Sequence, residues 1–395
     1  MGKRRKDYPL IEGLHITTLA AEGKAMGKVD NQVVFVPMTV PGDVVDVQVR
    51  KHHRRYMEAV VVRYVERSPL RTEPFCEHFG VCGGCKWQNL PYEEQLKQKT
   101  KQVEDQLVRI GHLAIPEVRP CLGSARTREY RNKLEFTFAD RRWLTYEEIA
   151  SGGDIEPVPA VGFHIPGCFD KVLDINRCHL QDDISNRIRL ATKTFCIERG
   201  YSFHNARAHE GLMRTMVVRT ASTGEIMVII VFNENDTARI DALMGHLRDM
   251  FPEITSLIYM INDKWNDSLG DREPICFAGK DHIIEQMEGL QFKVGPKSFY
   301  QTNSEQAYEL YKVTREFAEL KPTDILYDLY TGTGTIANFC ARRAAKVVGV
   351  EYVPEAIEDA VINSKLNNIA NTTFYAGDMK DVMSDKFIEH NGRPD

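Results

Sequence analysis

The sequence of 395 residues has no apolar run long enough to cross a bilayer. Its longest runs, such as residues 227–232 (Met-Val-Ile-Ile-Val-Phe), stop well short of the roughly 18 residues that a membrane-spanning helix needs. The basic residues at positions 3–6 are followed by Asp7, Tyr8 and Pro9 rather than by the apolar core of a secretory signal. We therefore expect a cytoplasmic chain with no membrane partner.

The chain also lacks internal repeats, low-complexity tracts and an even number of cysteines. Its apolar content of 43% and charged content of 27% exclude collagen-like, mucin-like and wholly disordered classes. Nine cysteines do not suit a disulfide framework, and clustered thiols in a cytoplasmic chain of this size more often bind metal. What is left is a globular chain of two or three domains.

The net charge of −5 is unevenly spread along the chain. Residues 1–71 hold 13 Lys and Arg against 8 Asp and Glu, so this segment is basic and the remainder is acidic. A small basic module commonly meets a polyanion, because each neutralised phosphate releases counterions. A merely solvated basic face has the same composition, and both interpretations stay open at this point.

Residues 8–66 alternate apolar and polar side chains with a period of two, as in residues 45–50 (Val-Asp-Val-Gln-Val-Arg). Pro41-Gly42 marks a turn between two such stretches. Several short strands in so little sequence predict a small barrel, since closing the sheet removes its edges. Small barrels bind nucleic acid or dock proteins, so the shape alone does not decide the function.

The middle of the chain predicts one helix and then a run of strands. The helix spans residues 91–110, and Gly111 ends it. Residues 126–296 read mainly as strands, with a hairpin turn at residues 222–224. The predicted apolar face of the helix comprises Tyr92, Leu96, Val103, Leu107 and Ile110.

Beyond Gln301 the apolar pattern takes a helical period. Asn303 can cap a helix, with Gln306 three residues further on. Strands and helices then alternate over residues 324–375, which predicts a βαβαβ unit with a parallel sheet. The predicted buried face of the first helix comprises Ala307, Leu310, Tyr311, Thr314, Phe317 and Ala318.

A glycine loop, residues 328–337 (Asp-Leu-Tyr-Thr-Gly-Thr-Gly-Thr-Ile-Ala), joins the first strand of this unit to its helix. Gly332 and Gly334 let the chain turn tightly and bring backbone amides against a ligand, and the same spacing also fits a dinucleotide fingerprint. Asp328 favours S-adenosylmethionine, because a carboxylate attracts a sulfonium and an amino group and repels a pyrophosphate. Glu351 suits the ribose hydroxyls of either cofactor, and Asp378 is placed to reach an adenine amino group.

A cysteine triplet precedes the predicted helix of the middle region. Cys76, Cys82 and Cys85 have C-x5-C-x2-C spacing, with two glycines between the last two thiols. Three ligands need a fourth, and Cys168 and Cys178 are the nearest downstream candidates. An iron–sulfur cluster accepts a triplet plus one remote cysteine, whereas structural zinc more often uses two paired C-x-x-C knuckles. The spacing therefore favours an iron–sulfur cluster over zinc.

Taken together and in this order, the motifs resemble the RNA uracil-C5-methyltransferase family. The resemblance rests on the cysteine triplet with Gln88, Tyr92 and Gln95 after it, on residues 299–303 (Phe-Tyr-Gln-Thr-Asn), and on residues 328–334. It covers essentially the whole chain, and the basic barrel resembles a TRAM domain, an appended RNA-binding module.

The resemblance implies a multidomain fold in three parts. Residues 1–70 would form an OB-like TRAM β-barrel, and residues 71–300 a central α+β domain that carries the iron–sulfur cluster. Residues 301–395 would form an α/β, Rossmann-like class I methyltransferase domain. The implied cofactor is S-adenosylmethionine, bound by the glycine loop and by Gln301, Tyr330, Glu351 and Asp378.

For the metal, the resemblance implies a four-iron four-sulfur (4Fe-4S) cluster on Cys76, Cys82, Cys85 and Cys178. Cys178 matches better than Cys168, because the family's fourth cysteine follows a short apolar strand, here residues 172–175.

The implied substrate is RNA. Family members with both the barrel and the cluster mostly methylate large-subunit ribosomal RNA, so we expect 23S rRNA as the partner of a monomeric enzyme. A paired, stacked base hides its C6 atom, so the target uridine must be unpaired or flipped out. Phe299 matches an aromatic residue near the target base. Arg126, Arg128, Arg131 and Lys133 are candidate RNA contacts and equally suit solvated strand positions.

The chain departs from the family at its catalytic residues. In the family a cysteine thiolate adds to C6 of uracil and a glutamate removes the C5 proton, and both follow a D-P-P-R loop after the fourth strand. None of these occurs here, and three strands fall short of the roughly five to seven in a doubly wound sheet. We therefore expect the domain to be truncated after its third strand, with the catalytic residues beyond Asp395. The alternatives are a non-catalytic iron–sulfur RNA-binding protein with a vestigial methyltransferase half, and an NAD-linked oxidoreductase.

Overall fold

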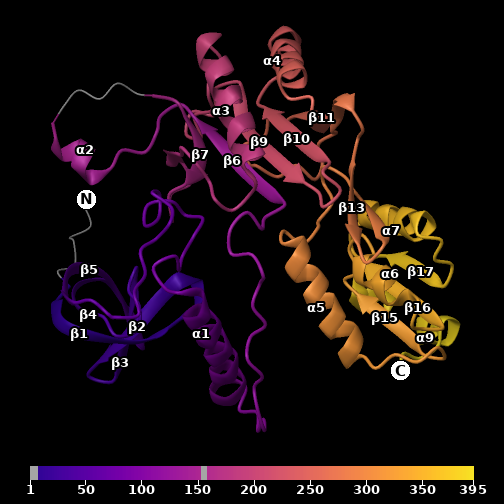
Figure 1. Cartoon of the computed structure of the whole chain (residues 1–395), viewed down its shortest axis with the longest axis horizontal. Coiled ribbons are helices and arrows are strands. Elements are labelled where there is room, and N and C mark those ends of the chain that lie inside the picture. The colour runs from indigo at the N-terminus through magenta and orange to yellow at the C-terminus, as the bar shows by residue number, and fades with distance from the viewer. Residues whose placement is uncertain (1–7, 153–157) are drawn as a thin grey trace. The chain divides into compact units, whose positions relative to one another are not determined.

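The computed structural model describes residues 8–152 and 158–395 (Figure 1). These residues form two compact units. The first unit extends to Thr127 and includes His164–Cys168, and the second comprises Arg128–Phe163 and Phe169–Asp395. Within the described ranges, no helix combines the length and apolarity that a bilayer crossing requires.

Five strands of the first unit close into a barrel in the order β1-β2-β3-β5-β4, which confirms the predicted barrel. Val45, Val47 and Val49 point into its core and are at most 1% exposed, as the period of two predicts. Asp46, between them, is also buried, because its carboxylate accepts hydrogen bonds from Gly13 N at 2.9 Å and Arg63 Nε at 2.8 Å. The elements are β1 (Leu10–Leu19), a short 3₁₀ turn (Ala21–Gly23), β2 (Lys24–Val29), β3 (Gln32–Pro37), β4 (Val44–His52) and β5 (Tyr56–Glu66).

A buried ion pair fastens the segment after β5 to the barrel. The Asp43 carboxylate is fully buried and accepts two hydrogen bonds from Arg71, at 2.7 and 2.8 Å. It also accepts from Ser68 N at 3.0 Å and Val40 N at 2.8 Å. Burial alone raises the pKa of Asp43, but these hydrogen bonds and the positive charge of Arg71 outweigh it and lower the pKa below its usual value.

The predicted helix at residues 91–110 forms as α1 (Tyr92–Asp105), continued by a π-helical turn (Gln106–Ile110) that ends at Gly111. Its predicted apolar face is covered only in part: Tyr92, Leu96 and Leu107 are half-buried, whereas Val103 is 47% and Ile110 76% exposed. The helix contacts the barrel through its first half, where Gln98 lies within 3.4 Å of Thr18 Oγ1. The later turns extend past that contact, and Val103 and Ile110 there stay exposed among the described residues.

A seven-stranded sheet in the order β12-β11-β10-β9-β6-β7-β8 forms the centre of the second unit. Two long helices interrupt the strands that the sequence pattern predicted, and they lie side by side (Figure 1). Their signals were present: Asp182 and Asp236 cap them, and Ile188, Thr192 and Phe195 are buried at helical spacing. The elements are β6 (Lys133–Ala139), α2 (Tyr146–Ala150), β7 (Ala160–His164), β8 (Val172–Asp174), α3 (Asp183–Glu198), β9 (Met213–Thr220), β10 (Ile226–Phe232), α4 (Thr237–Met250), β11 (Ile254–Ile261) and β12 (Ile275–Gly279).

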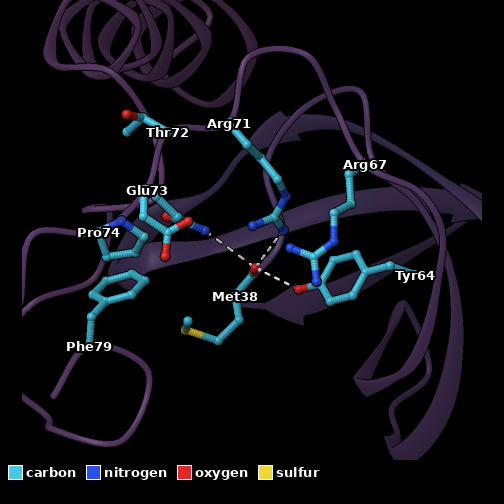
Figure 2. A pocket seen from close by; sticks show the side chains of 9 residues that line it. Met38, Tyr64, Arg67, Arg71, Thr72, Glu73, Pro74 and Phe79 are labelled. Carbon is cyan, nitrogen blue, oxygen red and sulfur yellow. Dashed lines mark hydrogen bonds between the residues drawn. The ribbon is translucent and has the colours of Figure 1, made fainter. Parts of the chain in front are cut away.

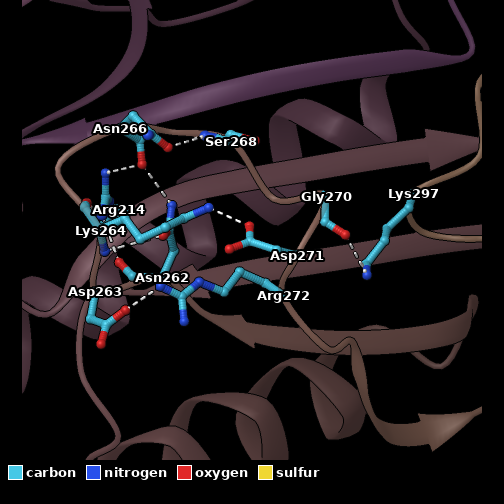
Figure 3. A network of polar contacts seen from close by, with 10 residues as sticks. All are labelled: Arg214, Asn262, Asp263, Lys264, Asn266, Ser268, Gly270, Asp271, Arg272 and Lys297. Atoms are coloured by element: carbon cyan, nitrogen blue, oxygen red, sulfur yellow. Dashed lines mark hydrogen bonds and ion pairs between the residues drawn. The ribbon is translucent and has the colours of Figure 1, made fainter.

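The loop after β11 is held by a buried arginine. Arg214, in β9, is 3% exposed and donates to the carbonyl oxygens of Asn262 and Lys264, both at 2.6 Å (Figure 3). It also pairs with the Asp267 carboxylate at 2.7 Å. The loop thereby presents Trp265, which is 75% exposed.

The hairpin formed by β13 (Ile283–Met287) and β14 (Leu290–Val294) connects the central sheet to the C-terminal part of the second unit. A single buried cluster joins Ile229 of the sheet, Phe292 of the hairpin, Tyr311 and Phe339. The two parts therefore share one core.

The C-terminal part begins with α5 (Ser304–Phe317), which Asn303 caps by accepting from Gln306 N at 3.0 Å, as predicted. Ala307 and Tyr311 are buried, but Leu310 and Phe317 of the predicted face are 54% and 69% exposed, because the helix contacts the core along a narrower stripe. The predicted βαβαβ unit follows, with all strands parallel in the order β15-β16-β17. The elements are β15 (Ile325–Leu329), α6 (Thr335–Ala341), β16 (Lys346–Glu351), α7 (Pro354–Leu366), β17 (Thr372–Ala376), α8 (Met379–Val382) and α9 (Asp385–Asn391).

Candidate functional site

Three carboxylates gather where the parallel strands β15, β16 and β17 end. Asp328 is the penultimate residue of β15, Glu351 is the last residue of β16, and Asp378 follows β17 by two residues. The strands pair in register, with Asp328 opposite Gly349 and Glu351 opposite Ala376. The carboxyl ends of parallel strands share one edge of a sheet, which is where open α/β sheets bind ligands.

The glycine loop between β15 and α6 has a backbone that most side chains do not tolerate. Tyr330, Gly332 and Gly334 all have positive φ, at 67°, 55° and 75°. A Cβ on Gly334 would lie 2.9 Å from Ala360 Cβ, whereas a Cβ on Gly332 would have no neighbour within 4 Å. Gly334 is thus needed for packing, and Gly332 faces open space.

Asp328 anchors the loop to the start of α6. One of its carboxylate oxygens accepts from Thr331 Oγ1 at 2.7 Å and from Ala337 N at 3.0 Å. Burial raises the pKa of Asp328 above its usual value and the negative charge of Glu351 adds to this, in spite of both hydrogen bonds. A cationic ligand would stabilise the ionised form of this carboxyl group.

Glu351 accepts a hydrogen bond from a backbone amide of the glycine loop. Its carboxylate accepts from Gly332 N at 3.1 Å and from Val353 N at 3.0 Å. Beside it, Tyr330 and Tyr352 are 72% and 71% exposed, and Val353 is 46% exposed. We did not single out Tyr352 and Val353 from the sequence, although two apolar residues directly after a strand-end acid are a usable signal.

Asp378 caps the short helix α8. Its carboxylate accepts from Lys380 N at 3.1 Å and lies 3.1 Å from the ammonium group of Lys380. The side chain is half-buried at the same strand edge as Glu351.

Tyr311 links Gln301 to the glycine loop, because it interacts with the side chains of both Gln301 and Asp328. Burial raises the pKa of Tyr311 to about 12, the charge of Asp328 adds to this, and a hydrogen bond with the Gln301 side chain opposes it. Asn132 holds the same segment from the other side, donating through Nδ2 to Gln301 O and to Ser304 Oγ, both at 2.8 Å. The structure therefore brings the segment after Phe299 together with the segment that carries Arg131.

Positive charge gathers beside Phe299, where Glu135 is the carboxylate nearest to Lys133, at 3.9 Å. Lys133 in β6 is directly opposite Arg219 in β9, an arrangement of like charges that by itself destabilises a sheet. Arg219 is 6% exposed and donates to Ser298 O at 2.7 Å, while its Nε has no partner in the part of the chain that the structure describes. Burial lowers the pKa of Lys133 and the charge of Arg219 lowers it further. Phe299 itself is 72% exposed.

We did not single out Arg219 from the sequence, where its only signal is a cation in the apolar strand at residues 216–219. Arg128 and Arg131 belong to this second unit, whereas Arg126 belongs to the first.

The cysteine triplet lies in loops of the first unit. Burial raises the pKa of the Cys82 thiol, and the neighbouring Cys85 and Cys76 raise it further, so the three sulfurs are close enough to interact electrostatically. Gly83 lies under the His164–Cys168 segment, where a Cβ would come within 2.7 Å of His164 O. Cys168 therefore belongs to the same unit as the triplet.

Cys178 belongs to the second unit, where it is buried. Its backbone N and O form a reciprocal pair with the Asn186 side chain, at 2.8 and 3.0 Å. Across residues 8–152 and 158–395, no three His, Cys, Asp or Glu side chains are grouped as metal ligands. The arrangement does not form a ligand set for a 4Fe-4S cluster, so the predicted cluster is not supported by this geometry.

Comparison with known domain families gives two matches. The TRAM domain matches residues 10–62, which contain the barrel strands, and a methyltransferase domain matches residues 321–391, which contain the glycine loop. The predicted TRAM barrel and C-terminal methyltransferase domain are thereby confirmed.

Two curated relatives match nearly the whole chain. An RNA methyltransferase of Bacteroides thetaiotaomicron is 57% identical over 95% of this chain and 84% of the relative. An RNA methyltransferase of Porphyromonas gingivalis is 54% identical over 97% of this chain and 83% of the relative. The chain belongs to this family of RNA methyltransferases.

Among solved structures, the tRNA (uracil-54, C5)-methyltransferase of Pyrococcus abyssi is similar to this chain over 93% of its length. The match covers 80% of that protein, with a TM-score of 0.69 and 26% identity. That structure was solved in complex with S-adenosyl-L-homocysteine. The resemblance to uracil-C5-methyltransferases drawn from the motifs is therefore confirmed at the level of the family.

Proposed function

We propose that this protein is an S-adenosylmethionine-dependent methyltransferase that forms 5-methyluridine in RNA. The observation that carries the proposal is the group of Asp328, Glu351 and Asp378 around a left-handed glycine loop, with Gln301 and Phe299 on the adjoining segment. The bound cofactor would supply a methyl group activated by its sulfonium charge. The relatives named RNA methyltransferases and the structural neighbour named for uracil C5 support the same activity.

The carboxylates of the site favour this cofactor over NAD. In a dinucleotide site, the amides of the glycine loop donate to the pyrophosphate of the ligand. Here the carboxylate of Glu351 already accepts a hydrogen bond from one of these amides, Gly332 N. Asp328 lies just beneath the same loop, and its negative charge would repel a pyrophosphate. A ligand with a sulfonium, an amino group and two ribose hydroxyls complements these charges.

We assign the substrate side of the site to Phe299 and to the cations around it. The exposed ring of Phe299 suits stacking against an unpaired base, and Arg131 and Lys133 suit the flanking phosphates, while the buried Arg219 adds positive charge to this side of the site. Burial raises the pKa of Cys196 to about 12 and of Cys340 to about 11, so neither thiol is activated for attack at neutral pH.

Donor binding is tested by calorimetry with S-adenosylhomocysteine. Glu351→Gln should weaken binding about tenfold or more, because a hydrogen bond to a charged group is worth about 1.5–3 kcal/mol. Glu355→Gln in the first turn of α7 removes the same charge from an exposed position and serves as the control. Equal affinities of the two variants for S-adenosylhomocysteine would contradict the assignment of Glu351 to the cofactor site.

The reaction is tested by incubating the gene product with tritiated methyl donor and unmodified RNA, followed by digestion to nucleosides. Label in 5-methyluridine from 23S rRNA supports the full proposal. Label in 5-methyluridine from tRNA alone keeps the reaction and changes the substrate. Label in any other nucleoside contradicts the proposal.

The cluster remains a prediction from the cysteine spacing and the resemblance. A 4Fe-4S cluster on Cys76, Cys82, Cys85 and Cys178 gives a brown protein with broad visible absorption. A colourless protein that holds zinc would assign the triplet to the alternative metal.

A further inference from the structure

A cavity of about 330 Å³ lies within the first unit, where the barrel meets the segment that leads to the cysteine triplet (Figure 2). Met38 lines it from the β3–β4 connection, Tyr64 from β5, and Arg67 and Phe79 from the following segment. The volume is at the lower end of the roughly 300–1,000 Å³ that small-ligand sites occupy. It is large enough for one nucleotide-sized group.

One wall of the cavity is rigid because its donors are already used. Tyr64 Oη, Arg71 Nη2 and Asn89 Nδ2 all donate to Met38 O, at 3.0, 3.0 and 3.3 Å (Figure 2). Arg71 is also held by its ion pair with Asp43. These groups shape the cavity and have little capacity left for a ligand.

Other residues that line the cavity carry groups without a hydrogen-bond or ion-pair partner in the described part of the fold. Arg67 is exposed, with its guanidinium 4.7 Å from the Tyr64 ring centre, and it has no carboxylate partner among the described residues. Glu73 is exposed and likewise makes no ion pair there. The Phe79 ring, beside Pro74, has no aromatic or cationic partner in the same set of residues (Figure 2).

This combination matches the parts of a single nucleotide. A half-buried aromatic ring next to a proline offers a stacking surface for a base, and a guanidinium without a carboxylate partner suits a phosphate. A carboxylate at the rim can accept from an exocyclic amino group or from a ribose hydroxyl. The first 71 residues of the sequence carry net positive charge, which favours a polyanion over a neutral peptide.

We propose that this cavity holds one unpaired nucleotide of the RNA substrate, outside the methyl-transfer site, with the base on Phe79 and its phosphate on Arg67. The proposal rests on the proposed function, because it takes the substrate to be RNA. The cavity is then a second contact that helps to choose the RNA and hold it in register.

The test measures the affinity of the protein for fluorescently labelled single-stranded RNA over a range of salt concentrations. Arg67→Gln should reduce the slope of log K against log salt by about 0.7, the value for one phosphate contact on a single strand. Phe79→Leu should weaken binding about fivefold or more and leave the slope unchanged, because stacking carries no charge. Arg109→Gln is the matched control, since Arg109 is an exposed arginine of the same unit that pairs with Asp105.

An Arg67→Gln slope equal to that of the control would overturn the phosphate contact, and an unchanged affinity for Phe79→Leu would overturn the base contact. Polyglutamate provides the charge without the bases, so competition by it that depends on Phe79 would assign the cavity to acidic peptides instead. Calorimetry with S-adenosylhomocysteine separates this proposal from the proposed function. Variants that bind the donor normally and lose RNA affinity support the cavity even if 5-methyluridine is not the product.

Discussion

Two glycines of the loop, Gly332 and Gly334, are separated by a single residue, and replacing each by alanine should disturb the protein for a different reason. Alanine at either Gly332 or Gly334 must adopt a left-handed backbone, which costs about 1–2 kcal/mol. At Gly334 the new methyl group would also lie 2.9 Å from Ala360 Cβ and 3.1 Å from Phe374 Cζ. Overpacking of this kind adds about 1–3 kcal/mol, so Gly334→Ala should cost about 2–5 kcal/mol in total.

Hydrogen–deuterium exchange of the peptides covering α6 measures this cost locally, where a global unfolding curve of a multidomain chain would not. Gly334→Ala should speed exchange there by at least about thirtyfold, since each 1.4 kcal/mol is a factor of ten. Gly332→Ala should affect exchange less, because nothing lies within 4 Å of its Cβ, and should instead block S-adenosylhomocysteine. Equal exchange in the two variants, or normal donor binding by Gly332→Ala, would refute the assignment of packing to one glycine and ligand approach to the other.

Three further outcomes are expected. Asp43→Asn should cost about 3–5 kcal/mol of stability, because it leaves Arg71 buried without its charged partner. Since the pKa of Asp43 is lowered in the fold, the stabilisation by this ion pair is present at neutral pH and is lost as the pH falls below 3.8. An acid titration of barrel stability measures this loss. Because the pKa of Asp328 is raised, the affinity for the cationic donor should increase as the pH rises from 3.8 through that raised pKa. Calorimetry over this pH range should show the increase for the wild type and a flat profile for Asp328→Asn. A flat profile for the wild type would contradict the role of Asp328. Arg214→Met should leave buried carbonyls without a donor at about 1–3 kcal/mol each, and exchange in the loop that carries Trp265 should rise, while unchanged exchange would show that the loop holds itself.

Much of the fold was predictable because it depends on short-range patterns. The alternation in residues 45–50 predicted barrel strands, the side chain of Asn303 predicted the start of α5, and the change from one period to another predicted the βαβαβ unit. The helices α3 and α4 were missed although their caps and spacing were present, because the strands on either side of them dominated the pattern.

The candidate site was predictable to the extent that its residues lie in one loop or at strand ends. Asp328, Glu351 and Asp378 are separated by more than twenty residues each, yet parallel strands bring their positions to one edge. Arg219 could not be found in this way, because its meaning comes from Lys133 opposite it on a strand far away in the sequence.

The sequence by itself determined the barrel, the order of the C-terminal strands and helices, and the glycine loop with its acidic partners. These features depend on side-chain periodicity and on backbone conformations that only a few residue types allow. The tertiary structure alone decided which apolar faces are covered, which cations face each other across neighbouring strands, and that Arg67 and Phe79 border a cavity. Such properties arise between segments that are distant in the chain, and burial, charge pairing and empty space exist only once those segments are packed together.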